Sequence, residues 1–177
     1  MPTRRAVLAG LASAGLAGTA PAHTPYGQWV VYRQKHLLIG AHRGDPQTYT
    51  LAKAVVAALE RELPAARARV ARGPHPRRIA ALMGTGQLLV AVLSAAEAQA
   101  MVWAVAPFEA DPPVPLVRLA ALGGEYGLVA VPDLPPAHAW QVVDALSHAG
   151  MAEAPGPGAL TVHPGAGAFW RGEPAPD

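Results

Sequence analysis

The chain has 177 residues, of which 51% are hydrophobic and 15% are charged, so its composition excludes an intrinsically disordered protein. It contains no cysteine, which excludes disulfides, zinc–thiolate sites and a cysteine nucleophile. The formal net charge is +2, but Arg4 and Arg5 belong to a predicted leader, and the rest of the chain holds 12 Lys and Arg against 12 Asp and Glu. The overall basicity is therefore no argument for a nucleic-acid partner.

The first residues have the form of a bacterial export signal. Arg4 and Arg5 precede an apolar run over residues 6–18, and residues 20–22 read Ala-Pro-Ala, the small-x-small form of a signal-peptidase site. The paired arginines resemble a twin-arginine signal, and an ordinary Sec signal is the alternative. We expect residues 1–22 to be a signal peptide cleaved after Ala22. We expect the mature protein to be periplasmic and not membrane-spanning.

Strand-like and helix-like segments alternate along the rest of the chain. Apolar runs predict buried strands, and apolar residues three or four positions apart predict helices. In chain order we expect a strand over 36–42, a helix over 49–63, a strand over 67–72, a helix over 74–84, a strand over 88–93, a helix over 94–106, strands over 117–122 and 127–131, and a helix over 135–150.

Three consecutive strand–helix units predict an α/β fold. We expect a parallel or mostly parallel sheet with helices on both faces. Residues 23–150 are predicted to form a single domain. Residues 151–177 are rich in glycine and proline and form a tail that packs on the domain or trails from it.

Ligands of open parallel sheets bind beyond the carboxyl ends of the strands, where the following helices begin. Here those loops supply a cation and several polar groups that suit a carboxylate or another small anion. The candidate ligand-binding residues are His42, Arg43, Thr48, Tyr49 and Ser94. In the alternative interpretation, Asp45 and Thr48 cap a helix and Arg43 is a solvated surface residue.

Seven histidines raise the question of a metal. His23 would become the first mature residue, and its amine and imidazole could together bind copper(II) if a second histidine lay close. The alternative is an exposed N-terminal histidine without a ligand. His163 is interpreted as a structural loop residue, and no cofactor is predicted.

Charge is divided unevenly between the two halves of the expected mature chain. Residues 23–78 hold ten basic and three acidic side chains, a balance of +7, and residues 79–177 hold two basic and nine acidic ones, a balance of −7. The basic half is either a docking face for an acidic partner or is neutralised by the acidic half within the fold.

Catalytic motifs are not recognisable. There is no Gly-x-Ser-x-Gly motif, and Ser94 and Ser147 are the only serines after residue 22. The Gly-Thr-Gly at residues 84–86 lacks the further glycine and lysine of a phosphate-binding loop. An enzyme is therefore the class that the sequence supports least, and we predict a non-enzymatic protein.

Four phrases resemble the TAXI family of TRAP-transporter solute receptors, which are periplasmic binding proteins. In chain order they are LLIGAHRGDPQTYTLAKAVVAAL, IAALMGTGQLLVAVLSAAEAQAM, VPDLPPAHAWQVVDAL and LTVHPGAGAFWRG, which together span most of residues 37–172. The resemblance implies one lobe of a type II periplasmic binding protein. It also implies a small organic anion as ligand, taken up by a TRAP-type transporter.

The chain also departs from that family. Family members are about twice as long and close two lobes on their ligand, whereas here the strand over 117–122 leads almost directly into the strand over 127–131. The chain thus resembles a single lobe. The alternative function is an accessory or interaction module for a periplasmic or membrane protein complex.

Overall fold

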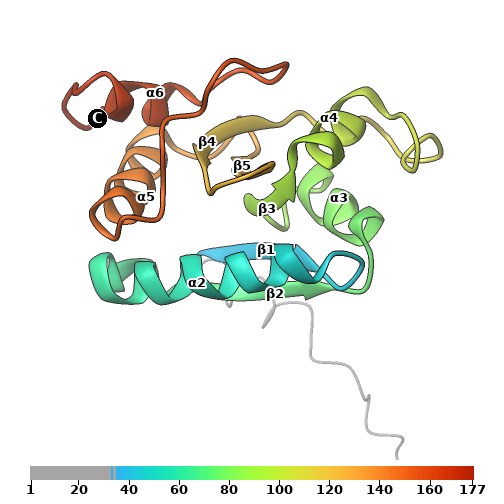
Figure 1. Cartoon of the computed structure of the whole chain (residues 1–177), viewed down its shortest axis with the longest axis horizontal. Helices are drawn as coiled ribbons and strands as arrows, with labels where there is room; N and C mark the ends of the chain where they lie inside the picture. Colours follow the sequence, from blue (N-terminus) through green and yellow to red (C-terminus); the bar gives the residue numbers. More distant parts are fainter. Residues whose placement is uncertain (1–32, 34) are drawn as a thin grey trace, which may run out of the picture.

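A computed structural model describes residue 33 and residues 35–177 (Figure 1). The expected signal peptide over residues 1–22 and the metal candidate His23 lie outside the described residues.

Five strands form one mixed sheet in the order β2-β1-β3-β5-β4. β1 pairs in parallel with β2 and β3, whereas β5 is antiparallel to both β3 and β4. Four strands therefore run in one direction and β5 runs against them, which confirms the expected mostly parallel sheet. The strands are β1 (Leu38–His42), β2 (Arg69–Gly73), β3 (Val90–Ser94), β4 (Val117–Ala121) and β5 (Tyr126–Ala130).

Helices cover both faces of this sheet, as expected. In Figure 1, α5 and α6 lie on the left, and α3 and α4 lie on the right. The helices on the first face are α2 (Pro46–Glu62), α5 (Pro136–His148) and α6 (Pro164–Trp170), and the helices on the second face are α3 (Pro76–Gly84) and α4 (Ala95–Trp103). A short 3-10 helix, η1 (Pro64–Ala66), follows α2. This α/β architecture is compatible with one lobe of a periplasmic binding protein.

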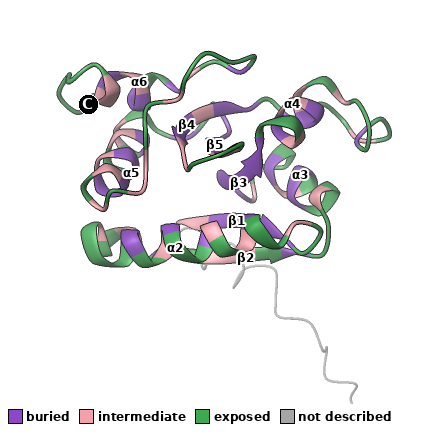
Figure 2. Ribbon diagram, in the orientation of Figure 1, coloured by how far each residue is buried: buried purple, intermediate pink, exposed green. Residues whose placement is uncertain are grey.

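The core has two parts, one on each side of the sheet. Successive side chains of a strand point to opposite faces. In β3, Val90 and Val92 pack with residues of α2 and α5, whereas Ala91 and Leu93 pack with residues of α3 and α4. All five residues of β3 are buried, and the strand lies at the centre of the molecule (Figure 2). The apolar run that predicted a buried strand therefore corresponds to the middle of the sheet.

Two helix boundaries differ from the prediction. The helix expected from residue 49 begins at Pro46, because Asp45 accepts a hydrogen bond from the Gln47 N–H at 2.9 Å and proline fits the first turn of a helix. The helix expected to reach residue 106 ends at Trp103, where Ala104 adopts a left-handed backbone with φ 49°.

β4 and β5 form a hairpin joined by residues 122–125. Gly123 and Gly124 have φ values of 96° and 57°, which glycine adopts without strain. The turn is closed by hydrogen bonds between Leu122 and Tyr126, and between Tyr126 and Gly123. The connection is thus a tight turn, as the short spacing in the sequence predicted.

The segment after residue 150 packs on the domain. Glu153 exchanges two backbone hydrogen bonds with Ala121, and residues 161–163 pair with Arg118, so this segment covers the outer edge of β4. It then forms α6, a helix that the lack of periodicity in the sequence did not predict. The Trp170 indole N–H donates to the Leu119 carbonyl at 2.9 Å and ties α6 to the sheet.

Candidate functional site

Three helices begin at the carboxyl edge of the sheet, directly after β1, β2 and β3. Each has a side-chain cap: Asp45 accepts from a backbone N–H of α2, His75 from one of α3, and Ser94 from one of α4. Each cap satisfies one of the N–H groups that a helix start leaves without a partner. At each helix start, one backbone N–H group that could bind an anion therefore already bonds to a side chain of the protein.

His42 ends β1 and is 1% exposed. Its Nε2 atom lies 3.0 Å from Oε1 of Glu97, in the first turn of α4, although the ring N–H is not aligned well enough for a hydrogen bond. Nδ1 of His42 and Oε2 of Glu97 are also buried, with no hydrogen-bond partner among the described residues. The two side chains thus form a contact pair that links β1 to α4.

The sequence contained a signal for the cap but not for this pair. Ser94 and Glu97 have the spacing of a capping box, and the structure confirms one half of it, because Ser94 Oγ accepts from the Glu97 N–H at 3.2 Å. The carboxylate of Glu97 instead contacts His42. Sequence reasoning missed Glu97 as a site residue because His42 lies 55 positions earlier.

Three other predicted ligand-binding residues have different surroundings, and one of them, Thr48, contacts His42. Thr48 is fully buried, and its hydroxyl bonds to the backbone of Asp45 and His42. The ring of Tyr49 lies 4.1 Å from the guanidinium carbon of Arg72. The side chain of Arg43 is exposed. Thr48 thus has a structural task, and a role for Arg43 and Tyr49 in binding stays a prediction.

Carboxylates gather beside Ser94 at the same edge. Tyr126 pairs with Ser94 across β5 and β3. A hydrogen bond to Asp45, together with partial burial and the nearby charges of Glu125 and Glu97, raises the pKa of Tyr126 to about 12. An anion placed here needs a strong cation nearby, because these carboxylates repel it.

Arg118 on β4 can supply this positive charge, although it is not among the candidate residues predicted from the sequence. Arg118 and Ser94 both line a cavity of about 250 Å³ between α4, the β4–β5 hairpin and residues 155–160. Arg118 Nη1 donates to the Gly156 carbonyl at 2.6 Å. A Cβ atom at Gly158 would lie 2.7 Å from Nη1, so any larger residue there would displace the guanidinium. Residues 155–160 form a strap over the guanidinium.

The other edge of the Arg118 guanidinium has no acceptor. Its Nε atom is buried without a hydrogen-bond partner, and no ion pair to Arg118 is found within the described part of the chain. Arg77 and Arg171 show what this edge can bind: each uses Nε and Nη2 to hold both oxygens of a carboxylate, on Asp111 and Glu173, at 2.6–3.0 Å. No carboxylate of the described residues binds Nε and Nη2 of Arg118 in this way.

The chain offers one indirect signal for this cavity, the Pro-Gly-Pro-Gly run at residues 155–158. Such a run predicts a loop but not what the loop covers. Arg118 lies 38 positions away from its Gly156 partner, so local pattern could not connect them.

Comparison with known proteins gives no assignment: no protein-family model and no curated protein matches the chain. Within residues 33 and 35–177, no helix is long and apolar enough to cross a membrane. The same residues contain no group of three or more His, Asp or Glu side chains placed to hold a metal ion.

Proposed function

We propose that the protein is an exported, non-enzymatic binding protein for a small organic anion, and that Arg118 is the residue that holds the anion. The observation that carries this proposal is Arg118 itself, which lines a cavity, has no carboxylate partner within the described chain and holds a buried Nε atom without a hydrogen-bond partner. Arg118 is half-buried, and its buried Nε–H has lost hydration without gaining an acceptor. A ligand carboxylate would compensate for that loss.

Two other polar groups of the cavity fit the same ligand class, whereas Glu125 faces it with a negative charge. The hydroxyl of Ser94 accepts a hydrogen bond from Glu97 and keeps its own proton for a ligand oxygen. Gln99 also lines the cavity and offers an amide donor. The volume of about 250 Å³ suits a molecule with a few carbon atoms. The leader and the resemblance to one lobe of the TAXI receptors support a periplasmic, transport-linked task.

Calorimetric titration of the full chain with acetate, lactate, succinate and glutamate tests this proposal. Arg118→Gln should weaken the best of these ligands roughly 10- to 150-fold, since a hydrogen bond to a charged group contributes about 1.5–3 kcal/mol. Arg118→Lys should also weaken it, because lysine keeps the charge but cannot form the fork.

Arg43→Gln is the matched control, because it removes the exposed cation that the sequence favoured. It should leave affinity unchanged. The proposal fails if wild type binds none of the four anions, or if Arg43→Gln rather than Arg118→Gln removes binding. Equal thermal melting of both variants and wild type shows that folding is intact.

An interaction module is the second candidate function, and one observation favours it. Trp103 and Val105, at the end of α4, are 55% and 49% exposed and form a small apolar surface. A partner protein recovered from periplasm with wild type and lost with Trp103→Ser would support docking there. Recovery that is identical for both proteins would contradict it.

A further inference from the structure

A second, larger cavity lies at the opposite, amino edge of the sheet. It has a volume of about 710 Å³, within the range of about 300–1,000 Å³ that is typical of small-molecule sites. Its walls come from the chain that enters β1, β2 and β3, from η1 and from the start of α5. It shares no residue with the Arg118 cavity.

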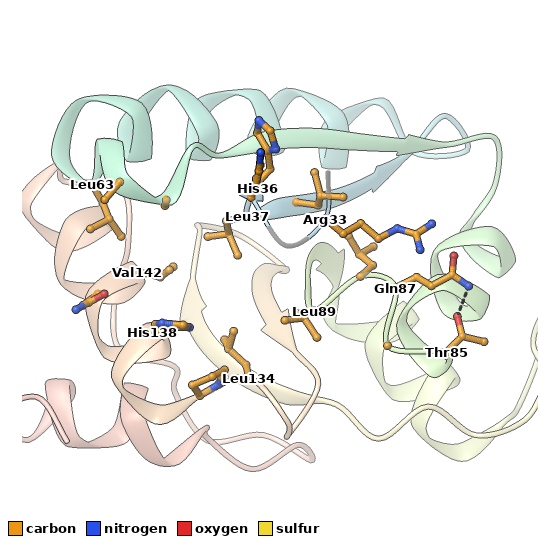
Figure 3. A pocket seen from close by; sticks show the side chains of 18 residues that line it. Arg33, His36, Leu37, Leu63, Thr85, Gln87, Leu89, Leu134, His138 and Val142 are labelled. Atoms are coloured by element: carbon orange, nitrogen blue, oxygen red, sulfur yellow. Dashed lines mark hydrogen bonds between the residues drawn. The ribbon is translucent and has the colours of Figure 1, made fainter. Parts of the chain in front are cut away.

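The middle of this cavity is apolar. Figure 3 shows Leu37, Leu89 and Leu134 between Arg33 on one side and His138 on the other. Leu63 and Val142 extend the apolar wall toward η1 and α5. Leu37 and Leu89 are half-buried, so they present apolar surface that the fold itself does not cover. An apolar group entering here would remove that surface from water.

The cavity is lined by cations but not by anions. Arg33 and Lys35 line it together with His36 and His138, and none of its described lining residues is Asp or Glu. Among them, Lys35 and His138 are exposed and Arg33 is half-buried. Gln87, held by a hydrogen bond to Thr85 at 3.0 Å, adds a neutral polar group beside Arg33 (Figure 3). The field inside such a cavity favours a negatively charged group.

We propose that this amino-edge cavity binds an aliphatic monocarboxylate, a fatty-acid-type anion of medium chain length. The alkyl chain would lie against Leu37, Leu89 and Leu134, and the carboxylate would lie at the rim toward Arg33 and Lys35. A neutral chain would leave Arg33 and Lys35 without a ligand charge, and a short anion would leave the half-buried Leu37 and Leu89 uncovered. The combination of the two surfaces therefore selects an amphipathic anion. The inference is independent of the proposed function at Arg118.

The first test is a calorimetric titration of the full chain with hexanoate, octanoate and decanoate. Each methylene that becomes buried contributes about 0.8 kcal/mol, so affinity should rise about fourfold per added carbon. 1-Decanol, which has the same chain without the charge, should bind at least tenfold more weakly than decanoate.

Variants then locate the site. The double variant Arg33→Gln/Lys35→Gln should weaken decanoate at least fivefold, and Ala66→Leu, which adds volume to the wall at η1, should weaken it at least tenfold. Arg118→Gln should leave decanoate affinity unchanged, which separates this site from the first. Arg61→Gln, an exposed charge elsewhere on α2, is the control for net charge.

Three results would overturn the inference. One is the absence of decanoate binding to the full chain at millimolar concentration. Another is decanol binding as tightly as decanoate. The third is a loss of decanoate affinity in Arg118→Gln but not in Ala66→Leu. A second variant, Leu89→Gln, checks the cavity from another wall, and its melting temperature shows whether the fold has survived.

Discussion

Charged side chains at the two edges of the sheet differ in what they contact. At the carboxyl edge, polar and charged side chains contact one another: His42 lies against Glu97, and the Tyr126 hydroxyl bonds to Asp45. At the amino edge, four basic side chains line a cavity of about 710 Å³ with no acidic residue among its described lining. At the carboxyl edge, acidic side chains therefore contact other side chains of the fold, whereas no acidic side chain belongs to the described lining of the amino-edge cavity.

This difference shows why a total charge or a half-chain charge predicts binding poorly. The sequence divides into a basic half and an acidic half, yet Arg118, a cation without a carboxylate partner among the described residues, belongs to the acidic half. The interaction energy of a cation depends mainly on whether an opposite charge lies within a few ångströms of it. The following changes test whether the edges differ in this way, from the largest expected effect to the smallest.

The largest effect should come from Gly165→Ala, which acts on the wall of the amino edge. A Cβ atom at Gly165 would overlap the carbonyl oxygen of Pro136, the first residue of α5. Backbone cannot move aside cheaply, so we expect a loss of about 3 kcal/mol in the free energy of unfolding, measured by urea denaturation.

Gly167→Ala on the same helix is the control. Its Cβ would meet only the flexible end of Arg171 at 3.0 Å and Val162 at 3.9 Å, and alanine favours a helix. Its stability should equal or slightly exceed that of wild type. A similar loss in both variants would mean that α6 tolerates no side chain at either position and that Pro136 is not the cause.

The next effect should come from Glu97→Ala at the carboxyl edge. The substitution removes the carboxylate that lies 3.0 Å from the buried Nε2 of His42, and the loss of such a polar contact in the interior costs about 1–3 kcal/mol. We expect a loss of about 2 kcal/mol in urea denaturation.

Lys35→Ala at the amino edge is the comparison for Glu97→Ala. Lys35 is exposed, and surface substitutions of this kind change stability by less than about 0.5 kcal/mol. If Lys35→Ala destabilised the protein as much as Glu97→Ala, the contrast between a buried contact at the carboxyl edge and an exposed cation at the amino edge would be wrong.

Tyr126 offers a local test of the same contrast. Its pKa of about 12 is caused first by the hydrogen bond to Asp45 and then by partial burial and the charges around it. Asp45→Asn should lower that pKa toward the ordinary value of about 10. The measurement is an ultraviolet titration of phenolate absorbance, with Tyr126→Phe identifying the transition. A pKa unchanged in Asp45→Asn would show that Asp45 is not the cause.

The elements themselves followed from local pattern more fully than the site did. β3 was predicted from an apolar run because it is buried on both faces, and the Ser94 cap was predicted from four consecutive residues. α6 was missed because it has seven residues, two of them glycine, and is stabilised mainly by contacts with α5 and β4.

The sites depend on contacts between distant parts of the chain. Arg118 meets the strap at Gly156, and His42 meets Glu97, each across many intervening residues. The amino-edge cavity is likewise assembled from four separate segments. Residue type and spacing identify a cation or a cap, but they do not say which cations lack a partner.

The smallest effect we expect is a pH dependence from His163, which links α6 to the amino edge. His163 is 1% exposed; its Nε2–H donates to the Leu134 carbonyl at 2.9 Å, and Nδ1 accepts from the Gly165 N–H at 3.1 Å. Both bonds together require the neutral ring. Burial lowers the pKa of His163 below its usual value near 6.5, although the backbone bonds to Leu134 and Pro132 oppose the shift.

Because the folded pKa lies below the unfolded one, the unfolded chain takes up the proton first as the pH falls. The contribution of His163 to stability is therefore complete above about pH 6.5 and is lost as the pH falls through the folded pKa. Asp144 raises the pKa of His148, which acts in the opposite sense and would mask part of this loss. As the pH is lowered from 7.5 to 5, the melting temperature should fall more steeply in His148→Gln than in wild type. It should fall least in the double variant His148→Gln/His163→Asn. If the double variant kept the full slope, the titrating group would lie elsewhere, and Leu134 at the amino edge would not be held by a neutral imidazole.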